Sequence, residues 1–488
     1  MRLALVFNPF KYKLHEENLR VVQKYFGLFP PLSLAWVAAI AERAGHDVIL
    51  VDARTLCLSK EDVADRLRDF GPDIIGFMMT TYMFRETLEW IQFMKKRFKV
   101  PVVIGGYNLR VYPRESLSPS VIDFGVVEHA DVTLPRLLEE LEGGRSFSDV
   151  PGLVYREGGE VMMTPLPERI LNFDSFPMPA RHLLPNHLYA EFPTERRNFT
   201  VLVSSLGCPR RCLFCEAGGT PHSPRSPATV VAEMEECHRR HSIREVDIFD
   251  YEFPCNRSRT LEICRGLREK SLDLTWACRS RVDSVDEDLL REMESAGCRR
   301  IYFGLESGSQ EILDRINKGV TLDRIRDTVR MTKEMGIRPL GFFLIGSPGE
   351  TRATVIETLK FAKELDLDYV QFSKATAKPL TGLWRMLLES GEADYWKEYI
   401  LGNVPEQALP RPWTELSNDE IDRLARWAYI RYHSRPSFLE KSVVKIRSFA
   451  EFKRKFLAYM DMLFRQEKVS ERDDLFMAYN ENAIRLPH

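Results

Sequence analysis

The stretch NFTVLVSSLGCPRRCLFCEAGG, residues 198–219, joins a short apolar run directly to three cysteines. Cys208, Cys212 and Cys215 have the spacing CxxxCxxC and follow a predicted strand at its C-terminal end. In parallel βα barrels that end of the strands carries the active site. The chain has nine cysteines, and the others are scattered, so this cluster indicates a metal centre rather than a disulfide framework.

The overall composition is that of a soluble globular protein. A length of 488 residues favours about two to four domains, and a net charge of −2 gives no global reason to expect nucleic acid. Residues 1–10, MRLALVFNPF, form too short an apolar run for a signal peptide, and no apolar stretch reaches the roughly 18 residues of a membrane span. We therefore expect a cytoplasmic protein.

The alternation that begins with the quoted strand continues downstream. Further strand-like runs are REVDIFDYEF, LTWACRSR, RRIYFGLESGS, RPLGFFLIGSPGE and LDYVQFSKATA, with helix-like segments before them. This makes about six βα units in residues 198–385, fewer than the eight of a closed barrel. The sequence therefore predicts an open, partial (β/α)6 barrel.

Upstream, residues 1–145 alternate apolar strands with longer helical segments, as in RLALVFN, HDVILVDA, DIIGFMMT and VPVVIGG. This pattern predicts a doubly wound, Rossmann-like α/β domain with a parallel sheet. Such a sheet binds ligands beyond the carboxyl ends of its strands. The candidate binding residues at those ends are Thr80, Thr81, Gly105 and Gly106.

Two regions lack the alternation. Residues 146–197 are rich in proline and predict a linker with a small hairpin, whereas residues 386–488 predict a helical domain. Between Arg431 and Lys468 there are ten Lys or Arg against four Asp or Glu, and apolar residues recur at spacings of three and four. We expect amphipathic helices there, which either cap the barrel or lie on an anionic lipid surface.

Two metal centres are compatible with the three thiols. Structural zinc takes four protein ligands, and His222 would be the fourth. An iron–sulfur cluster held by three thiolates instead leaves one iron open to an exogenous ligand, as chemistry at the metal requires. The remaining cysteines have no paired spacing, and we expect them to be buried free thiols: Cys57, Cys237, Cys255, Cys264, Cys278 and Cys298.

The cysteine motif, its place after the first strand and the partial barrel together resemble the radical S-adenosylmethionine (SAM) superfamily. Phe214 matches the aromatic residue usual before the third cysteine of that family. The resemblance implies that Cys208, Cys212 and Cys215 hold a [4Fe-4S] cluster and that SAM chelates the fourth iron. It also implies that electron transfer from the cluster cleaves SAM to a 5′-deoxyadenosyl radical.

Further matches lie at the ends of later strands. FGLESGS resembles the fourth-strand motif of the family, which implies that Glu306 and Ser307 reach the amino acid or ribose of SAM. GFFLIGSPGET resembles the fifth-strand segment, which implies that Gly346, Pro348 and Gly349 shape a backbone approach to the adenosine.

Charged residues at the second and third strands are further candidates. In FDYEF, Asp250 and Glu252 stand where the family often has paired acidic residues, although Tyr251 separates them here. On the third strand, Arg279 and Arg281 either meet the SAM carboxylate or the substrate, or form ordinary salt bridges.

A doubly wound domain ahead of such a barrel resembles the cobalamin-binding domain of the B12-dependent subfamily. PPLSLAWVAAIAERAGHDVILVDA and VVIGGYNLRVYP are similar to the segments around its corrin and nucleotide tail. The motif DxHxxG is absent, which implies cobalamin without a protein imidazole on cobalt. In VVEHADVTL only Glu128 and Thr133 fit the pattern usual there, and a nucleotide or flavin in the same crevice is the alternative ligand.

The resemblance implies a cobalamin-dependent radical SAM enzyme, most often a C-methyltransferase. In that chemistry one SAM methylates cob(I)alamin, a second gives the radical that abstracts hydrogen, and methylcobalamin quenches the substrate radical. The cobalt must then face the cluster across the substrate, so we expect the site between the two α/β domains. The alternatives are a radical cyclisation or rearrangement, as in the anaerobic magnesium-protoporphyrin cyclase, and a zinc-stabilised binding protein.

The expected partners are a small-molecule or lipid substrate and a reductant such as flavodoxin or ferredoxin, with no nucleic acid. Basic helical tails similar to residues 431–468 occur in subfamily members that modify hopanoid-type lipids, which implies a peripheral membrane contact. The sequence assigns no residue to a catalytic acid or base.

Overall fold

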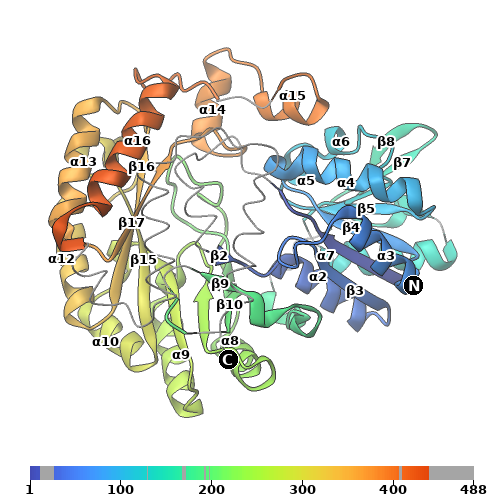
Figure 1. Ribbon diagram of the computed structural model, residues 1–488, viewed down its shortest axis with the longest axis horizontal. Helices are drawn as coiled ribbons and strands as arrows, with labels where there is room; N and C mark the ends of the chain where they lie inside the picture. The colour runs from blue at the N-terminus through green and yellow to red at the C-terminus, as the bar shows by residue number, and fades with distance from the viewer. Residues whose placement is uncertain are drawn as a thin grey trace. The chain divides into compact units, whose positions relative to one another are not determined.

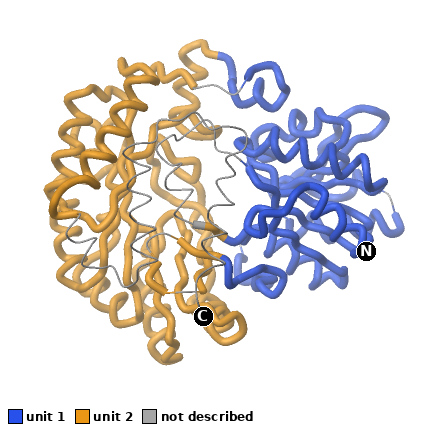
Figure 2. The backbone as a smooth tube through the Cα atoms, viewed as in Figure 1, with its two compact units in different colours: residues 1–14, 30–188, 393–407 blue, residues 15–29, 189–392, 408–488 orange. Residues whose placement is uncertain are grey.

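The computed structural model describes residues 1–10, 27–128, 130–144, 146–167, 172–191, 194–196, 198–405 and 409–438. The chain forms two compact units (Figure 2). Unit 1 takes its described residues from Met1–Leu14, Pro30–Leu188 and Ala393–Gln407, and unit 2 takes them from His15–Phe29, Tyr189–Glu392 and Ala408–His488. Each unit therefore contains segments that are distant in the sequence.

Unit 1 is built on a seven-stranded sheet in the order β3-β1-β4-β5-β6-β7-β8. Its first five strands are parallel: β3 (Asp47–Asp52), β1 (Arg2–Phe7), β4 (Ile74–Met78), β5 (Val102–Gly105) and β6 (Phe124–Val126). The larger helices are α2 (Leu32–Arg43), α3 (Lys60–Phe70), α4 (Phe84–Arg97) and α7 (Ala130–Glu139), and two short ones follow β5, α5 (Asn108–Val111) and α6 (Pro113–Ser116). This arrangement confirms the predicted doubly wound domain.

The hairpin predicted in residues 146–197 consists of β7 (Leu153–Glu157) and β8 (Glu160–Met163). It joins the edge of the unit 1 sheet, where β7 pairs antiparallel with β6. Val154 on β7 is fully buried, so the hairpin contributes to the core of this unit.

Unit 2 contains a six-stranded, all-parallel sheet in the order β10-β13-β14-β15-β16-β17. The strands are β10 (Phe199–Leu202), β13 (Glu245–Ile248), β14 (Thr275–Ser280), β15 (Cys298–Glu306), β16 (Arg338–Ile345) and β17 (Tyr369–Lys374). The connecting helices lie along the outside of this curved sheet (Figure 1): α8 (Pro227–His241), α9 (Arg257–Lys270), α10 (Glu287–Ser295), α11 (Gln310–Arg315), α12 (Leu322–Glu334) and α13 (Arg352–Leu365). The order confirms the partial (β/α)6 barrel.

The barrel helices begin at residues suited to that position. Ser226 caps α8 and Pro227 follows at the first helical position, and Thr351 forms a capping box at the start of α13. Such caps satisfy backbone N–H groups that have no partner within the helix. Each cap therefore defines the last residue of the loop that connects the carboxyl end of a strand to the next helix.

The main core of unit 2 lies between the sheet and its helices, and it includes Trp276, Phe303 and Phe343. The other face of the sheet carries a smaller cluster formed by Ala277, Tyr302, Leu340 and Tyr369. Most strand residues are buried, and they include the charged side chains of Glu245, Asp247 and Arg300, so these strands are less uniformly apolar than those of unit 1.

The segment after the barrel divides between the two units. Helix α14 (Gly382–Glu389) and helix α16 (Asn418–His433) belong to unit 2, where Ile421 and Tyr432 of α16 complete its main core. Helix α15 (Tyr395–Leu401) belongs to unit 1. Residues 439–464, which carry most of the predicted basic amphipathic pattern, lie outside the described residues. None of the described helices is long and apolar enough to cross a membrane.

Candidate functional site

The three cysteines lie in a loop at the carboxyl end of β10. A short antiparallel pair, β11 (Ser205–Leu206) and β12 (Ser223–Pro224), closes the loop at its base. Within it, the backbone N–H of Cys215 donates to the carbonyl of Cys212 at 3.1 Å. Gly207 has a φ of +75°, and a Cβ there would lie 2.0 Å from the carbonyl oxygen of Pro221, so only glycine fits.

Neighbouring elements of unit 2 hold the loop in place. The N–H of Leu213 donates to the carbonyl of Ile316 at 3.0 Å, and Asn317 Nδ2 donates to the carbonyl of Arg211 at 2.8 Å. On the other side, the N–H of Leu383 donates to the carbonyl of Leu213 at 3.2 Å. The turn after α11 and the start of α14 therefore both support the cysteines.

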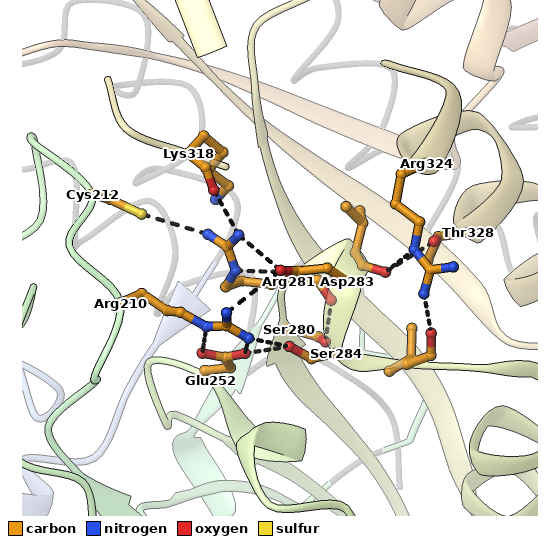
Figure 3. Close-up of polar contacts among 12 residues, drawn as sticks. Arg210, Cys212, Glu252, Ser280, Arg281, Asp283, Ser284, Lys318, Arg324 and Thr328 are labelled. Atoms are coloured by element: carbon orange, nitrogen blue, oxygen red, sulfur yellow. Dashed lines mark hydrogen bonds and ion pairs between the residues drawn. The ribbon is translucent and has the colours of Figure 1, made fainter. Parts of the chain in front are cut away.

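Charged side chains contact two of the thiols. Arg281 donates from Nη1 to Sγ of Cys212 at 3.6 Å (Figure 3). The Cys208 thiol lies 3.8 Å from Oε2 of Glu252. Arg210 in turn pairs with Glu252, with Nε 3.3 Å from Oε2. Two guanidinium groups therefore suit an anionic centre here, Arg210 within the loop and Arg281 directly after β14.

Burial weakens the acidity of two of the three thiols. It raises the pKa of Cys208 above its usual value and that of Cys215 to about 11. A bound metal deprotonates a coordinating thiol, so ligation here releases protons and becomes tighter as the pH rises. No group of three or more His, Cys, Asp or Glu among the described residues converges on a single ion position. A [4Fe-4S] cluster binds each of its cysteines on a different iron, and three separated thiols in one loop fit it.

His222, the fourth ligand in the zinc alternative, is also near the base of the loop. Its Nε2 atom is buried and has no hydrogen-bond partner among the residues that the structure describes, and burial lowers the pKa of its imidazole. The imidazole is therefore kept neutral. The four residues do not form a group that would hold one zinc ion.

The two acidic residues of FDYEF have different surroundings. Asp250 accepts hydrogen bonds from the N–H and hydroxyl groups of both Ser204 and Ser205, at 2.5–3.0 Å. It therefore fixes the strand that leads into the cysteine loop. Glu252 instead faces Cys208, Arg210 and Ser284, while Tyr251 between them is 48% exposed.

The fourth-strand motif ends in an ion pair that the sequence did not predict. Oε1 of Glu306 lies 2.8 Å from Nζ of Lys318, and both side chains are buried. Glu306 has a φ of +63°, and a Cβ on Gly304 would lie 2.5 Å from its carboxylate, so the glycine of FGLES makes room for the pair. Ser307 is also buried, and its hydroxyl lies 3.1 Å from Oγ1 of Thr358.

Lys318 connects this motif to the cysteine loop. Its backbone carbonyl accepts a hydrogen bond from Nη2 of Arg281 at 2.6 Å, the same guanidinium that contacts Cys212 (Figure 3). Its ammonium lies 6.0 Å from the ring of Phe214. The cysteine motif and the fourth-strand motif therefore form one connected site at the carboxyl end of the barrel.

The fifth-strand segment turns sharply after β16. Gly346 has a φ of +86°, and its N–H donates to Glu350, which also accepts from the N–H of Ser347 at 3.1 Å. Pro348 lies within this turn, and Gly349 donates its N–H to the carbonyl of Trp413 at 2.8 Å. Burial raises the pKa of Glu350 to about 7. Glu350 was not among the predicted site residues, although it is the last residue of the pattern GSPGE.

The two candidate arginines differ. Arg281 belongs to the cysteine site, as described above. Arg279 donates from Nη1 to Oδ1 of Asp247 at 2.8 Å, and its guanidinium lies over the ring of Phe249 at 3.6 Å. This ion pair joins the third barrel strand, which carries Arg279, to the second, which carries Asp247.

In unit 1, the predicted binding residues lie at neighbouring strand ends. Thr80 and Thr81 follow β4, and Gly105 and Gly106 close β5. The N–H of Met79 donates to the carbonyl of Gly105 at 2.7 Å. Gly106 has a φ of +145°, and a Cβ there would lie 2.2 Å from the carbonyl oxygen of Met79, so the two loops are in close contact.

Glu128 lies after β6, has a φ of +62° and pairs with Arg110, with Oε1 2.9 Å from Nε. Thr133 of α7 is buried, and its hydroxyl donates to the carbonyl of Pro151 at 2.8 Å. Arg110 is on α5, so its ion pair connects the ends of β5 and β6.

Comparison with protein families assigns both units. Residues 202–362 match the radical SAM superfamily, and residues 19–138 match the B12 binding domain. An uncharacterised methyltransferase from Pyrococcus horikoshii is 33% identical over 427 residues, which cover 86% of this chain and 91% of the relative. The anaerobic magnesium-protoporphyrin IX monomethyl ester cyclase of Rubrivivax gelatinosus is 27% identical over 384 residues, 76% of this chain and 69% of the cyclase.

Among solved structures, a similar fold is that of the radical SAM methyltransferase TsrM from Kitasatospora setae, with cobalamin and a [4Fe-4S] cluster bound. The TM-score is 0.64 at 20% sequence identity, over 80% of this chain and 75% of the other. The similarity therefore concerns the fold, and it extends over both units.

Proposed function

Because the chain belongs to the cobalamin-binding radical SAM family, we propose that it is a C-methyltransferase that acts on an unactivated carbon. The observation that supports methyl transfer best is the similarity to a methyltransferase over 86% of the chain, across both units. The cofactors are a [4Fe-4S] cluster, SAM and cobalamin. Together these cofactors supply a 5′-deoxyadenosyl radical and a methyl group carried on cobalt.

In this proposal Cys208, Cys212 and Cys215 hold the cluster. The support is their enclosure in one loop, with buried thiols and with Arg281 donating to Cys212. The guanidinium stabilises the thiolate form by a charge-assisted hydrogen bond. Glu252, paired with Arg210, orients the loop from the side of Cys208.

We assign SAM to the adjoining residues of the barrel. Glu306 presents a buried carboxylate held by Lys318, which suits the ammonium of SAM, and Ser307 follows it. The backbone of Gly346 and Pro348 forms a turn that Glu350 braces, which suits close approach of a flat base. Asp250 acts indirectly, because Ser204 and Ser205 take up both of its oxygens.

We assign cobalamin to the strand ends of unit 1, with Thr80, Thr81, Gly105, Gly106 and Glu128 around it. A Cβ on Gly105 would meet nothing within 4 Å, so space is open beside the end of β5, which suits a large planar ligand. Open sheets of this kind bind their ligands at these strand ends.

A radical cyclisation or rearrangement is the second candidate function, because the magnesium-protoporphyrin cyclase is 27% identical over 384 residues. The two candidates differ in the products of SAM. Loss of the methyl group leaves S-adenosylhomocysteine, whereas reductive cleavage leaves 5′-deoxyadenosine and methionine. A methyltransferase gives both nucleoside products, and a cyclase gives 5′-deoxyadenosine alone.

The test is anaerobic incubation of the reconstituted enzyme with hydroxocobalamin, methyl-labelled SAM and a titanium(III) reductant, followed by mass spectrometry of both nucleosides. Formation of S-adenosylhomocysteine together with 5′-deoxyadenosine supports methylation. 5′-Deoxyadenosine without S-adenosylhomocysteine contradicts it and favours cyclisation. The Cys212→Ala variant is the control and should form no 5′-deoxyadenosine.

We also propose that the acceptor is lipid-like and that the C-terminal segment contacts the membrane surface. The support is the excess of six positive charges in residues 431–468, combined with apolar residues at helical spacing. Sedimentation with phosphatidylglycerol vesicles tests this, with Lys453, Arg454 and Lys455 replaced together by glutamate. The control replaces Arg239 and Arg240, which are exposed on α8. Equal sedimentation of wild type and the triple variant would contradict membrane contact.

A further inference from the structure

Residues 393–405 follow the barrel in the chain but pack within unit 1 (Figure 2). We call this segment the strap. It contains α15 and is rich in aromatic residues, with the sequence ADYWKEYILGNVP. A segment that leaves one unit, packs on the other and returns requires specific contacts, because ordering it costs conformational entropy.

The strap is attached to unit 1 at both of its ends. At the start of α15, the hydroxyl of Tyr112 donates to Oδ1 of Asp394 at 2.8 Å. At the other end, Nη2 of Arg85 donates to the carbonyls of Tyr399 and Val404. The guanidinium of Arg85 also lies over the ring of Tyr399, 4.1 Å from its centroid. Tyr112 follows β5, and Arg85 is in the first turn of α4.

The middle of the strap packs on the loop that follows β4. Trp396 is completely buried, and its ring meets that of Tyr82 edge to face, with centroids 4.9 Å apart. Tyr82 lies in the turn Thr80–Met83, in which the N–H of Met83 donates to the carbonyl of Thr80. The strap therefore contacts the turn that carries two of the candidate cobalamin-binding residues.

This contact extends to the neighbouring strand end. Met79 precedes the turn and lies against the backbone of Gly106, where a hydrogen bond from Met79 to Gly105 joins the two loops. Displacement of the turn would consequently shift the backbone at β5 as well. Both loops are part of the edge at which an open α/β sheet binds its ligand.

We propose that the strap is part of the cobalamin site and that Trp396 and Arg85 are positioning residues, which hold the Thr80–Met83 turn in the geometry that binds the corrin. The proposal rests on the assignment of cobalamin to unit 1. It implies that the C-terminal third of the chain determines cofactor affinity at the N-terminal domain.

The test is equilibrium binding of hydroxocobalamin to the full-length protein, followed by visible spectroscopy. Trp396→Ala removes the edge-to-face pair, and we expect the Kd to rise roughly fivefold or more. Trp396→Phe keeps an aromatic ring and should restore most of the affinity. Arg85→Lys keeps the charge but loses the planar contact with Tyr399 and should also weaken binding.

Two further measurements separate positioning from a general loss of structure. Iron, sulfide and SAM binding belong to unit 2 and should be unchanged in Trp396→Ala. Hydrogen exchange should be faster at the N–H of Met83, which donates to the carbonyl of Thr80 in the wild type. Equal cobalamin affinities of wild type and Trp396→Ala would overturn the strap proposal alone. A wild type that binds no cobalamin would contradict the assignment of this cofactor to unit 1.

Discussion

Arg281 donates a hydrogen bond to the sulfur of Cys212 and, from its other terminal nitrogen, to the backbone of Lys318, whose ammonium pairs with Glu306. One guanidinium on the third barrel strand thus connects a cysteine of the CxxxCxxC motif to the fourth-strand motif. The candidate cluster site and the candidate SAM site share their support. A change at Arg281 is therefore expected to affect both.

Replacing Arg281 should weaken retention of the cluster. Arg281→Ala removes a charge-assisted donor to a ligand thiolate, and loss of such partners typically lowers metal affinity about 10-fold or more. The reduction potential of the cluster should also fall. The reduced cluster carries one more negative charge than the oxidised cluster, so loss of the positive guanidinium destabilises the reduced form more. Iron release to a chelator and a redox titration measure both effects. Arg257→Ala, which removes an exposed ion pair with Asp286, is the matched control and should change neither.

Substitutions should distinguish the three proposed cluster ligands from His222 and Cys255, which are also possible metal ligands by residue type. Cys208→Ala, Cys212→Ala and Cys215→Ala should each lose the iron and sulfide of the reconstituted protein. His222→Ala and Cys255→Ala should retain both, because neither is a ligand in the proposed site. Metal analysis after anaerobic purification measures this. Stoichiometric zinc that disappears in His222→Ala would support the zinc-stabilised binding protein instead.

Glu306→Gln should weaken SAM binding without loss of the cluster. The substitution removes the carboxylate charge that we assign to the SAM ammonium and leaves Lys318 buried without its counter-ion. We expect the Kd for SAM to rise at least about 10-fold, as for truncation of a buried charge pair. Anaerobic calorimetry measures it. Unchanged affinity together with unchanged iron would show that Glu306 does not contact SAM.

Glu350 should make stability depend on pH. Burial raises its pKa in the folded protein to about 7, above the ordinary value of 4.5. The folded state therefore binds the proton more tightly than the unfolded state, and its contribution to stability decreases as the pH rises from about 4.5 to 7. At pH 8 the wild type carries a buried carboxylate at this position, whereas the Glu350→Gln side chain is neutral. The free energy of unfolding of Glu350→Gln should therefore exceed that of wild type by about 3 kcal/mol at pH 8. Denaturant unfolding at pH 5 and pH 8 gives the comparison, and a difference independent of pH would contradict it.

Two adjacent glycines in unit 1 should respond differently to alanine. A Cβ at Gly106 would lie 2.2 Å from a backbone oxygen, whereas one at Gly105 would meet nothing within 4 Å. Gly106→Ala should therefore destabilise unit 1 by about 3 kcal/mol, as overpacking does, and Gly105→Ala should not. Thermal unfolding of both variants measures this. If cobalamin occupies the space beside Gly105, Gly105→Ala should weaken cobalamin binding at unchanged stability.

The sequence by itself determined both α/β units and the cysteine motif. The parallel strands of unit 1 are almost continuously apolar, and apolar residues in the helices of both units recur at helical spacing, so the alternation is visible locally. The three cysteines lie within eight residues, so they are close in space irrespective of how the rest of the chain folds. The resemblance to a cobalamin-binding radical SAM family followed from these local features.

Only the tertiary structure decided which partner each polar side chain takes. Asp250 and Glu252 are equivalent in the sequence, yet one is bound by Ser204 and Ser205 while the other faces Cys208. No local pattern in the sequence distinguishes Lys318 from the other lysines, and only the fold brings it next to Glu306. Trp396 packs on Tyr82, more than 300 residues earlier in the chain by their numbers. The spacing of apolar residues predicts single helices and strands. It does not predict contacts between distant segments, because these form only when the chain has folded.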